Sequence, residues 1–117
     1  MLNNHCPDCS GALRISKLTC EDCGLGLEGT FATPRLSRLE AEEQRFVELF
    51  VLASGSLKQM AELLGVSYPT VRIRLDRLIE HLKAQQARDE EHKRQILDDI
   101  ENGRVRPKQG MRMIENL

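Results

Sequence analysis

Apolar and polar positions along the chain divide it into segments with different periods. Residues 1–33 show no helical period, and short apolar stretches alternate there with Gly, Thr and Ser, as in short strands and turns. Residues 37–83 carry apolar residues three and four positions apart, which predicts helices. Residues 84–95 contain no large apolar residue, and an apolar pattern returns over residues 96–117. The sequence therefore predicts a mainly α chain that begins with a small β segment.

Start and stop signals divide the middle segment into three predicted helices. The first spans about residues 39–53, follows a capping box formed by Ser37 and Glu40, and ends at Gly55. In a capping box the hydroxyl and the later side chain satisfy each other's unpaired backbone N–H groups. The apolar surface of this helix is wide enough to pack against two other helices.

A sharp turn joins the second and third predicted helices. Ser56 and Gln59 form another capping box, which opens a helix at residues 57–64. Gly65 supplies the left-handed residue for the exit from this helix, and Ser67 can cap the helix that follows. Three helices joined in this way form a compact bundle.

The residues around this turn have the spacing of a helix-turn-helix. Ala61 is small where two helices cross closely, Val66 fills the turn, and Val71 anchors the third helix to the core. One side of the third helix is apolar, and the opposite side is polar and basic. Such a helix enters the DNA major groove with its N-terminal half, where arginines reach guanine edges or phosphates. The predicted DNA-contacting residues are Ser67, Tyr68, Thr70, Arg72, Ile73, Arg74 and Arg77.

The charge distribution restricts a DNA-facing surface to this third helix. The formal net charge is -1, which excludes a generally basic protein that coats polyanions. Residues 67–83 hold four basic and two acidic residues, whereas residues 39–66 hold five glutamates and two basic residues. A second interpretation therefore stays open, in which the arginines only solvate a helical bundle that is used for protein contacts.

All the cysteines lie in two Cys-x-x-Cys pairs near the N-terminus. Two such pairs, ten residues apart, are typical of one tetrahedral zinc site with four thiolate ligands. Disulfides would need an oxidising compartment, and the first residues contain no apolar signal segment. A closed shell of four thiolates leaves no position for water or substrate, so this single zinc is expected to be structural. The predicted ligands are Cys6, Cys9, Cys20 and Cys23.

The sequence Leu-Gly-Val-Ser-Tyr-Pro-Thr-Val-Arg-Ile-Arg-Leu at residues 64–75 resembles the helix-turn-helix of the Fis type. Together with the four-cysteine ribbon and the tripeptide Pro34-Arg35-Leu36, it is similar to an uncharacterised bacterial family, a domain of unknown function. Members of that family are short proteins with an N-terminal zinc ribbon and a Fis-like helix-turn-helix. The resemblance covers about residues 5–83, and it implies an architecture more firmly than an activity.

The C-terminal third predicts a linker followed by an association element. Oppositely charged residues four positions apart predict a solvated helix over residues 84–95. Two short apolar stripes on either side of Asn102-Gly103 then predict a helical hairpin over residues 96–117, which loosely resembles the SHOCT type. Stripes this short need a partner, either another chain or the body of the protein. The predicted association residues are Ile96, Leu97, Ile100, Met111, Ile114 and Leu117.

The predicted organisation has four parts. A zinc ribbon occupies residues 1–33, a helix-turn-helix domain residues 34–83, a helical linker residues 84–95, and the hairpin residues 96–117. No stretch approaches the about 18 consecutive apolar residues of a membrane span. We therefore expect a cytoplasmic protein. Because the short apolar stripes of residues 96–117 need a partner, we also expect a homodimer or higher homo-oligomer.

The expected function is sequence-specific binding of double-stranded DNA by a bacterial transcriptional regulator with a structural zinc ribbon. The alternative is a protein-interaction adaptor, in which ribbon and hairpin hold other proteins and the helix-turn-helix is a scaffold. A third possibility is thiol redox sensing through zinc release. An enzyme is the least expected outcome, because His5, His81 and His92 are scattered without a nucleophile and base in one cleft.

Overall fold

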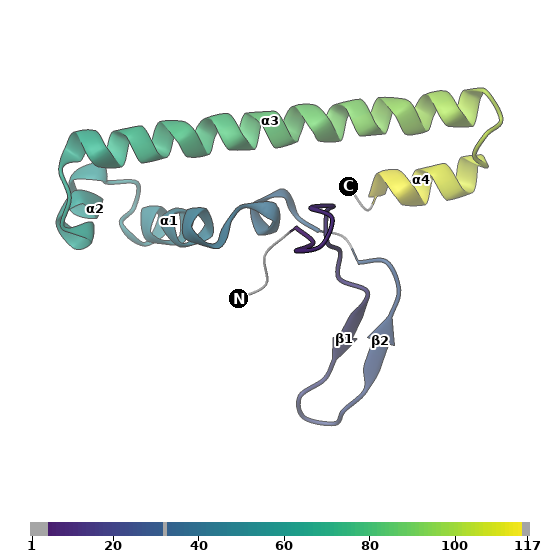
Figure 1. The fold of residues 1–117 in the computed structure, drawn as a ribbon, viewed down its shortest axis with the longest axis horizontal. Coiled ribbons are helices and arrows are strands. Elements are labelled where there is room, and N and C mark those ends of the chain that lie inside the picture. Colours follow the sequence, from purple (N-terminus) through teal and green to yellow (C-terminus); the bar gives the residue numbers. More distant parts are fainter. Residues whose placement is uncertain (1–4, 32, 116–117) are drawn as a thin grey trace. The chain divides into compact units, whose positions relative to one another are not determined.

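The computed structural model describes residues 5–31 and 33–115. Its elements, labelled in Figure 1, confirm a mainly α fold with a small β ribbon. Among the described residues, no helix combines the length and the apolar character that crossing a membrane would need. In chain order the elements are β1 (Lys17–Thr19), β2 (Gly26–Glu28), the 3-10 helix η1 (Arg35–Arg38), α1 (Ala41–Leu52), α2 (Leu57–Leu64), α3 (Tyr68–Glu101) and α4 (Pro107–Glu115).

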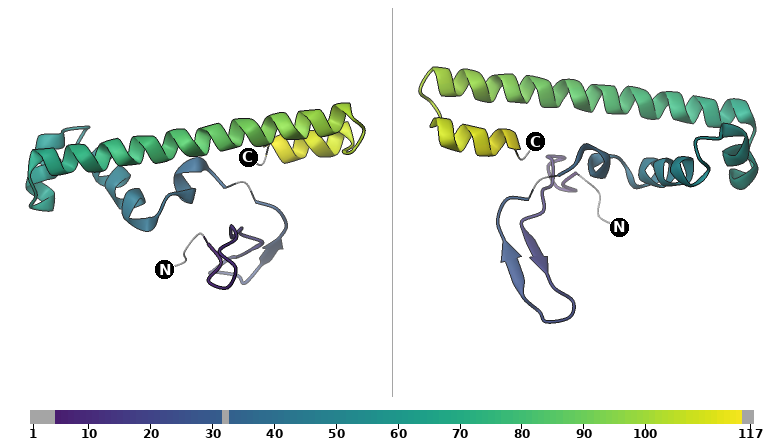
Figure 2. Two further views of the ribbon diagram at one scale, coloured as in Figure 1. Left: turned by 45° about the horizontal axis from the view of Figure 1, so that its top comes forward. Right: turned by 180° about the vertical axis from the view of Figure 1, so that it is seen from behind.

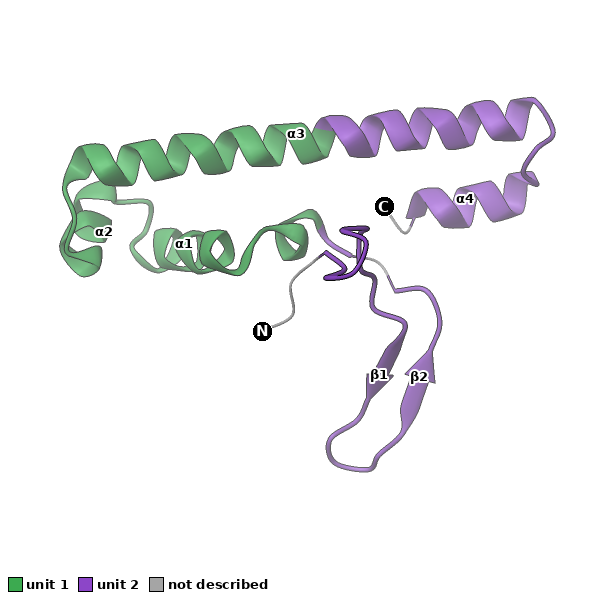
Figure 3. Cartoon of the chain, in the orientation of Figure 1, with its two compact units in different colours: residues 1–3, 35–86 green, residues 4–34, 87–117 purple. Residues whose placement is uncertain are grey.

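The chain divides into two compact units, which Figure 3 colours separately. Of the described residues, the first unit holds 35–86, and the second holds the ribbon up to Pro34 together with residues from Ala87 onward. The division falls inside α3, so this helix contributes to both units.

The ribbon is a two-stranded antiparallel hairpin with very little burial. Leu18 pairs with Leu27 at its centre, and Lys17 faces Glu28 at one end, with the Lys17 Nζ atom 3.6 Å from Glu28 Oε1. Residues 7–30 are all exposed. Apolar burial therefore contributes little to the stability of this segment, as expected for a hairpin that depends on a metal.

The core of the first unit lies where α1, α2 and the beginning of α3 meet. Ala53 is 2% exposed, and Met60 and Val71 are fully buried. Val71 therefore anchors α3 as the sequence predicts. Partly buried apolar residues from all three helices pack around this cluster, namely Phe46, Leu49, Phe50, Leu57, Ala61 and Val66.

The predicted caps of α2 and α3 are present. The backbone N–H of Gln59 donates to Ser56 Oγ over 3.2 Å, and the N–H of Thr70 donates to Ser67 Oγ over 3.4 Å. Gly65 ends α2 with φ 66°, in the left-handed region that glycine adopts without a steric penalty. Both helix starts and the turn between them are thus set by local side-chain chemistry.

The capping box predicted at Ser37 and Glu40 is wrong. Glu40 is itself the N-cap of α1, and its side chain makes no capping hydrogen bond, while Ser37 lies inside η1. The Gln44 Nε2 group instead donates to the backbone oxygens of Ser37 (3.1 Å) and Leu39 (2.8 Å). Because Leu39 is only 1% exposed, its burial fixes the chain before α1, and the helix begins at Ala41.

Helix α3 continues without a break through the segment predicted as a solvated helical linker. Figure 2 shows it from two sides as one continuous helix that leads through a turn into α4. Within this polar stretch Glu91 pairs with Arg94, three residues further on, and just before it Glu80 pairs with Lys83 over 3.8 Å. Such pairs stabilise a helix surface that has no apolar partner.

A close contact joins α4 to the end of α3. Ile96 is 2% exposed, Ile100 is half-buried, and Gly110 is buried. A Cβ atom added to Gly110 would lie 2.3 Å from Ile100 Cδ1 and 2.6 Å from its Cγ1. Two residues of the first predicted stripe, Ile96 and Ile100, therefore approach α4 at Gly110, and the absence of a side chain at Gly110 permits this approach.

The other predicted association residues differ in how exposed their side chains are. Leu97 is 47% exposed and Met111 is 51% exposed, whereas Ile114 is half-buried. Leu117 lies outside the described residues. The apolar side chains left exposed on the hairpin are therefore fewer than the sequence pattern alone indicates.

The Gly110→Ala substitution is expected to destabilise the α3–α4 hairpin by about 1–3 kcal/mol, the usual range for overpacking a filled contact. Alanine favours a helix over glycine by about 1 kcal/mol, so a net loss means that the clash outweighs helix propensity. Hydrogen exchange of the α4 amides measures the effect.

The matched control is the same substitution in an Ile100→Val background. Valine lacks the Cδ1 atom that lies nearest to the added Cβ, so the loss of protection is expected to be smaller there. Equal losses in both backgrounds would contradict the contact.

Candidate nucleic-acid interface and metal site

A rigid turn sets the direction in which α3 leaves the core. The Gly65 N–H donates to the Glu62 oxygen (3.3 Å), and the Val66 N–H donates to the Ala61 oxygen (3.1 Å). Val66 also packs against the buried cluster. With Val71 buried one turn into α3, the side of the helix opposite to Val71 must face away from the core.

The exposed side of the first turns of α3 carries three of the predicted DNA-contacting residues. Tyr68 is 52% exposed, Ile73 is 53% exposed, and Arg72 is also exposed. The Arg72 guanidinium lies 3.4 Å from Asp76 Oδ1, and both side chains are more than half exposed. A surface ion pair of this kind is worth little energy, so Arg72 can exchange Asp76 for a phosphate or a base edge.

Two of the predicted contacts are engaged in capping. Ser67 Oγ lies 2.9 Å from Thr70 Oγ1 and also accepts the Thr70 N–H. Their hydroxyls therefore stabilise the start of the helix.

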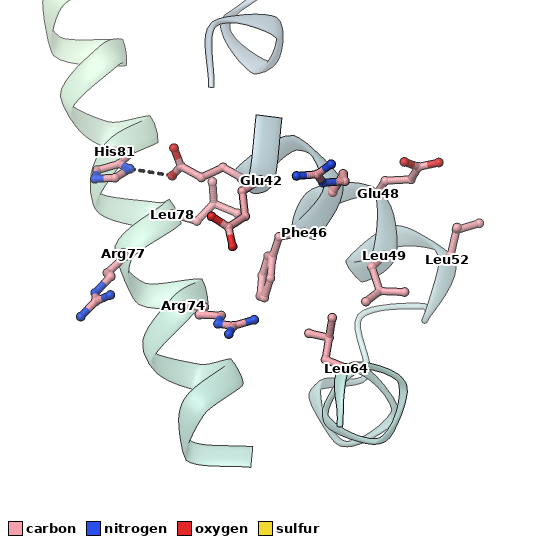
Figure 4. A pocket seen from close by; sticks show the side chains of 12 residues that line it. Glu42, Phe46, Glu48, Leu49, Leu52, Leu64, Arg74, Arg77, Leu78 and His81 are labelled. Carbon is pink, nitrogen blue, oxygen red and sulfur yellow. Dashed lines mark hydrogen bonds and ion pairs between the residues drawn. The ribbon is translucent and has the colours of Figure 1, made fainter. Parts of the chain in front are cut away.

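The remaining two predicted contacts, Arg74 and Arg77, line a groove between α1 and α3 (Figure 4). The groove has a volume of about 650 Å³. The sequence predicts that Arg72, Arg74 and Arg77 share one outward surface, whereas in the structure Arg72 does not line this groove. The apolar part of its lining comes from Phe46, Leu49, Leu52, Leu64 and Leu78.

One polar contact between α1 and α3 was missed by the sequence analysis. The His81 Nδ1 atom lies 2.6 Å from Glu43 Oε2, which Figure 4 marks with a dashed line. The two residues are 38 positions apart, and no local pattern pairs them. This bond joins α1 to α3 beside the groove.

The two Cys-x-x-Cys turns of the ribbon have matching backbone geometry. The Ser10 N–H donates to the Cys6 oxygen (2.8 Å), and the Gly24 N–H donates to the Cys20 oxygen (2.9 Å). Ser10 and Gly24 both have positive φ values, 62° and 76°. The chain therefore bends in the same way after each pair, as a metal-binding turn requires.

The first cysteine of each pair sits where donors stabilise a thiolate. The pKa of Cys6 is lowered first by the backbone N–H of Cys9, then by that of Asp8 and by the Cys9 thiol. The corresponding donors two and three residues further on lower the pKa of Cys20 in the same order. Since zinc binds thiolates and not thiols, both turns fit this metal chemically.

The structure pairs Cys6 with Cys9 and Cys20 with Cys23, and all four are free of disulfides. Over residues 5–31 and 33–115, no three His, Cys, Asp or Glu side chains gather closely enough to hold a metal ion. Four thiolates repel one another, so the attraction that joins two such pairs has to come from a cation.

In metal-free protein, Cys6 and Cys20 are expected to react with iodoacetamide faster than Cys9 and Cys23 near neutral pH. A lowered pKa raises the fraction of thiolate, which is the reactive form. Peptide mass spectrometry of a timed alkylation gives the four rates. Equal rates for all four thiols at neutral pH would contradict the assignment.

Comparison with protein-family models gives two matches, which adjoin along the chain. Residues 39–85 match the model described as "Domain of unknown function (DUF2089)-HTH", and residues 6–37 match the model described as "DUF2089 zinc ribbon". No curated protein and no solved structure matches the chain. The matches confirm the zinc ribbon and the helix-turn-helix that the sequence pattern predicted.

Proposed function

We propose that this chain, which belongs to the uncharacterised DUF2089 family of zinc-ribbon and helix-turn-helix proteins, binds double-stranded DNA sequence-specifically and regulates transcription. A helix-turn-helix and a zinc ribbon are features of binding proteins that recognise nucleic acids. The observation that carries the proposal is the exposed side of α3 directly after the rigid turn at Gly65. In this proposal the protein works by binding and is not an enzyme.

The residues on that side have complementary roles toward DNA. Arg72 supplies the charge for a phosphate or a guanine edge, while Tyr68 and Ile73 supply apolar surface for base edges such as the thymine methyl group. Ser67 and Thr70 add hydroxyl groups at the N-terminal end of the helix, where the helix dipole favours a phosphate. Arg74 and Arg77 line the groove and are the least direct of the proposed DNA contacts.

A single copy would bind DNA weakly, because few cations lie on this face and few counterions are released. We therefore propose a homodimer or higher oligomer that places two α3 helices on half-sites about 34 Å apart. Linking two weak contacts in this way raises the apparent affinity through effective concentration. The exposed hairpin residues Leu97 and Met111 are candidates for part of the association surface.

The proposed metal is one structural zinc per chain, held by Cys6, Cys9, Cys20 and Cys23. Reduced thiols of this kind persist in a reducing cytoplasm, where we place the protein. In the same proposal, residues 1–33 form the ribbon domain, residues 34–83 the DNA-binding domain, residues 84–95 a linker, and residues 96–117 the association element.

A second candidate function, that of a protein-interaction adaptor, is favoured by the surface of the ribbon. Leu18 is 47% exposed and Leu27, directly opposite it, is 55% exposed, while Leu25 at the turn is 61% exposed. Apolar side chains gathered on so small a hairpin suit contact with a protein partner. The two functions are compatible if the ribbon holds a partner while α3 holds DNA.

The Arg72→Ala substitution is expected to weaken binding to random-sequence duplex DNA severalfold. It should also lower the slope of log affinity against log salt by about 0.9, the contribution of one phosphate contact. Fluorescence anisotropy at several salt concentrations measures both quantities.

Arg88→Ala is the matched control, since it removes an exposed arginine from the polar part of the same helix. Its affinity and salt slope should remain those of the wild type. Absent or salt-insensitive binding by the folded, zinc-loaded wild type would reject the DNA proposal and favour the adaptor.

Zinc analysis is expected to give one zinc ion per wild-type chain and a large loss of zinc in the Cys20→Ser variant. The helical circular-dichroism signal should remain, because the buried cluster of the first unit contains no ribbon residue. His5→Ala is the control for this substitution, since His5 adjoins Cys6 and pairs only by a backbone bridge with Ala12. Retention of zinc by Cys20→Ser, or its loss in His5→Ala, would overturn the ligand assignment.

A further inference from the structure

The groove between α1 and α3 has an apolar floor that the described residues of the first unit leave open. Phe46, Leu49 and Leu78 contribute to the floor, and Leu78 is nearly buried. At the rim, Leu52 is 73% exposed and Leu64 is 38% exposed (Figure 4). A protruding leucine beside an apolar hollow is the arrangement that a packed interface uses.

The two walls of this groove carry opposite charge. On the α1 side, Glu42 and Glu48 join Glu43, and Arg45 only partly offsets them. The α3 wall carries Arg74 and Arg77 together with His81. The groove as a whole is close to neutral, but it is strongly polarised from one wall to the other.

Within the described residues, five of these wall side chains are unpartnered, Arg45 among them. Within residues 5–31 and 33–115, neither Glu42 nor Glu48 makes a side-chain hydrogen bond or ion pair, and the same holds for Arg74 and Arg77. In contrast, Arg72 just outside the groove is paired with an acidic residue. An occupant that pairs with these carboxylates and guanidinium groups must itself carry both positive and negative groups, together with apolar surface for the exposed leucines.

We propose that this groove is the interface with a second copy of the chain, related by a two-fold axis. Under such an axis the acidic α1 wall of each copy faces the basic α3 wall of the other, so the same attraction occurs twice. Leu52 of each copy then enters the apolar floor of the other. A small anionic ligand would satisfy Arg74 and Arg77 but leave Glu42 and Glu48 unpaired, which is why a second copy fits better.

In such a dimer, the three arginines in the first turns of α3 have separate roles. Arg74 and Arg77 hold the second copy, while Arg72 stays exposed on the side that carries Tyr68 and Ile73. The proposed dimer does not rest on DNA binding, because the interface is complete without nucleic acid. It also differs from association through the C-terminal hairpin, which lies in the other unit.

Charge reversal of one wall at a time tests the interface. One variant carries Glu42→Lys and Glu48→Lys, and the other carries Arg74→Glu and Arg77→Glu. Each variant alone should be monomeric, because both of its facing walls then have like charges. An equimolar mixture should form a dimer, since every facing pair of walls is again opposite in sign.

Sedimentation velocity of the full zinc-loaded chain, without DNA and at tens of micromolar, measures the mass. The wild type is expected at twice the mass of one chain, each variant at the mass of one chain, and the mixture at twice that mass. Glu62→Lys on α2 and Arg72→Glu on α3 are controls outside the groove, and both should remain dimeric. Circular dichroism confirms that every variant keeps its helices.

A monomeric wild type, variants that stay dimeric on their own, or a mixture that stays monomeric would each overturn the proposal. Loss of the dimer in either control would also overturn it, because those charges lie outside the groove. None of these results depends on whether the protein binds DNA, so failure here is distinguishable from failure of the DNA-binding proposal.

Discussion

Burial of Val71 against Met60 is the contact on which the first unit depends. Both side chains are fully buried, and each contributes about 1.5–3 kcal/mol by leaving water. A helix is rigid over several turns, so fixing Val71 also fixes the directions of Arg72 and Ile73 on the other side. The left-handed residue Gly65 lets α2 and α3 meet at the angle that this burial requires. The orientation of the exposed surface is thus a consequence of the core.

The ribbon does not depend on apolar burial. Its side chains are exposed, and its preformed part is the backbone of two Cys-x-x-Cys turns with matching hydrogen bonds. These turns hold Cys6 and Cys20 among N–H donors that favour the thiolate. The backbone thereby lowers the free energy of metal binding in advance, while joining the two pairs depends on the metal itself. The helical unit is stabilised by apolar burial, and the ribbon is built for coordination.

Charge on this chain matters through its distribution, because the net charge is only -1. The acidic α1 and the basic beginning of α3 stand on opposite sides of one groove, where Glu43 and His81 already form a contact. The acidic α1 wall weakens attraction to a polyanion. In the proposed dimer the same wall faces the basic α3 wall of the second copy. In the proposed dimer, assembly uses the groove side of α3, and the proposed DNA contact uses mainly the side that carries Arg72.

Local interactions were readable from the sequence, because each involves residues within about five positions. These include the α2 and α3 caps at Ser56 and Ser67, the turn at Gly65, and the cysteine pairs. The tertiary structure decided what depends on distant segments: the rejection of the Ser37 capping box, the contact of Gly110 with Ile100, and the groove that separates Arg74 from Arg72. Helical periodicity says which residues share a side of a helix. It does not say which other helix that side meets, and burial and pairing between distant segments decide this.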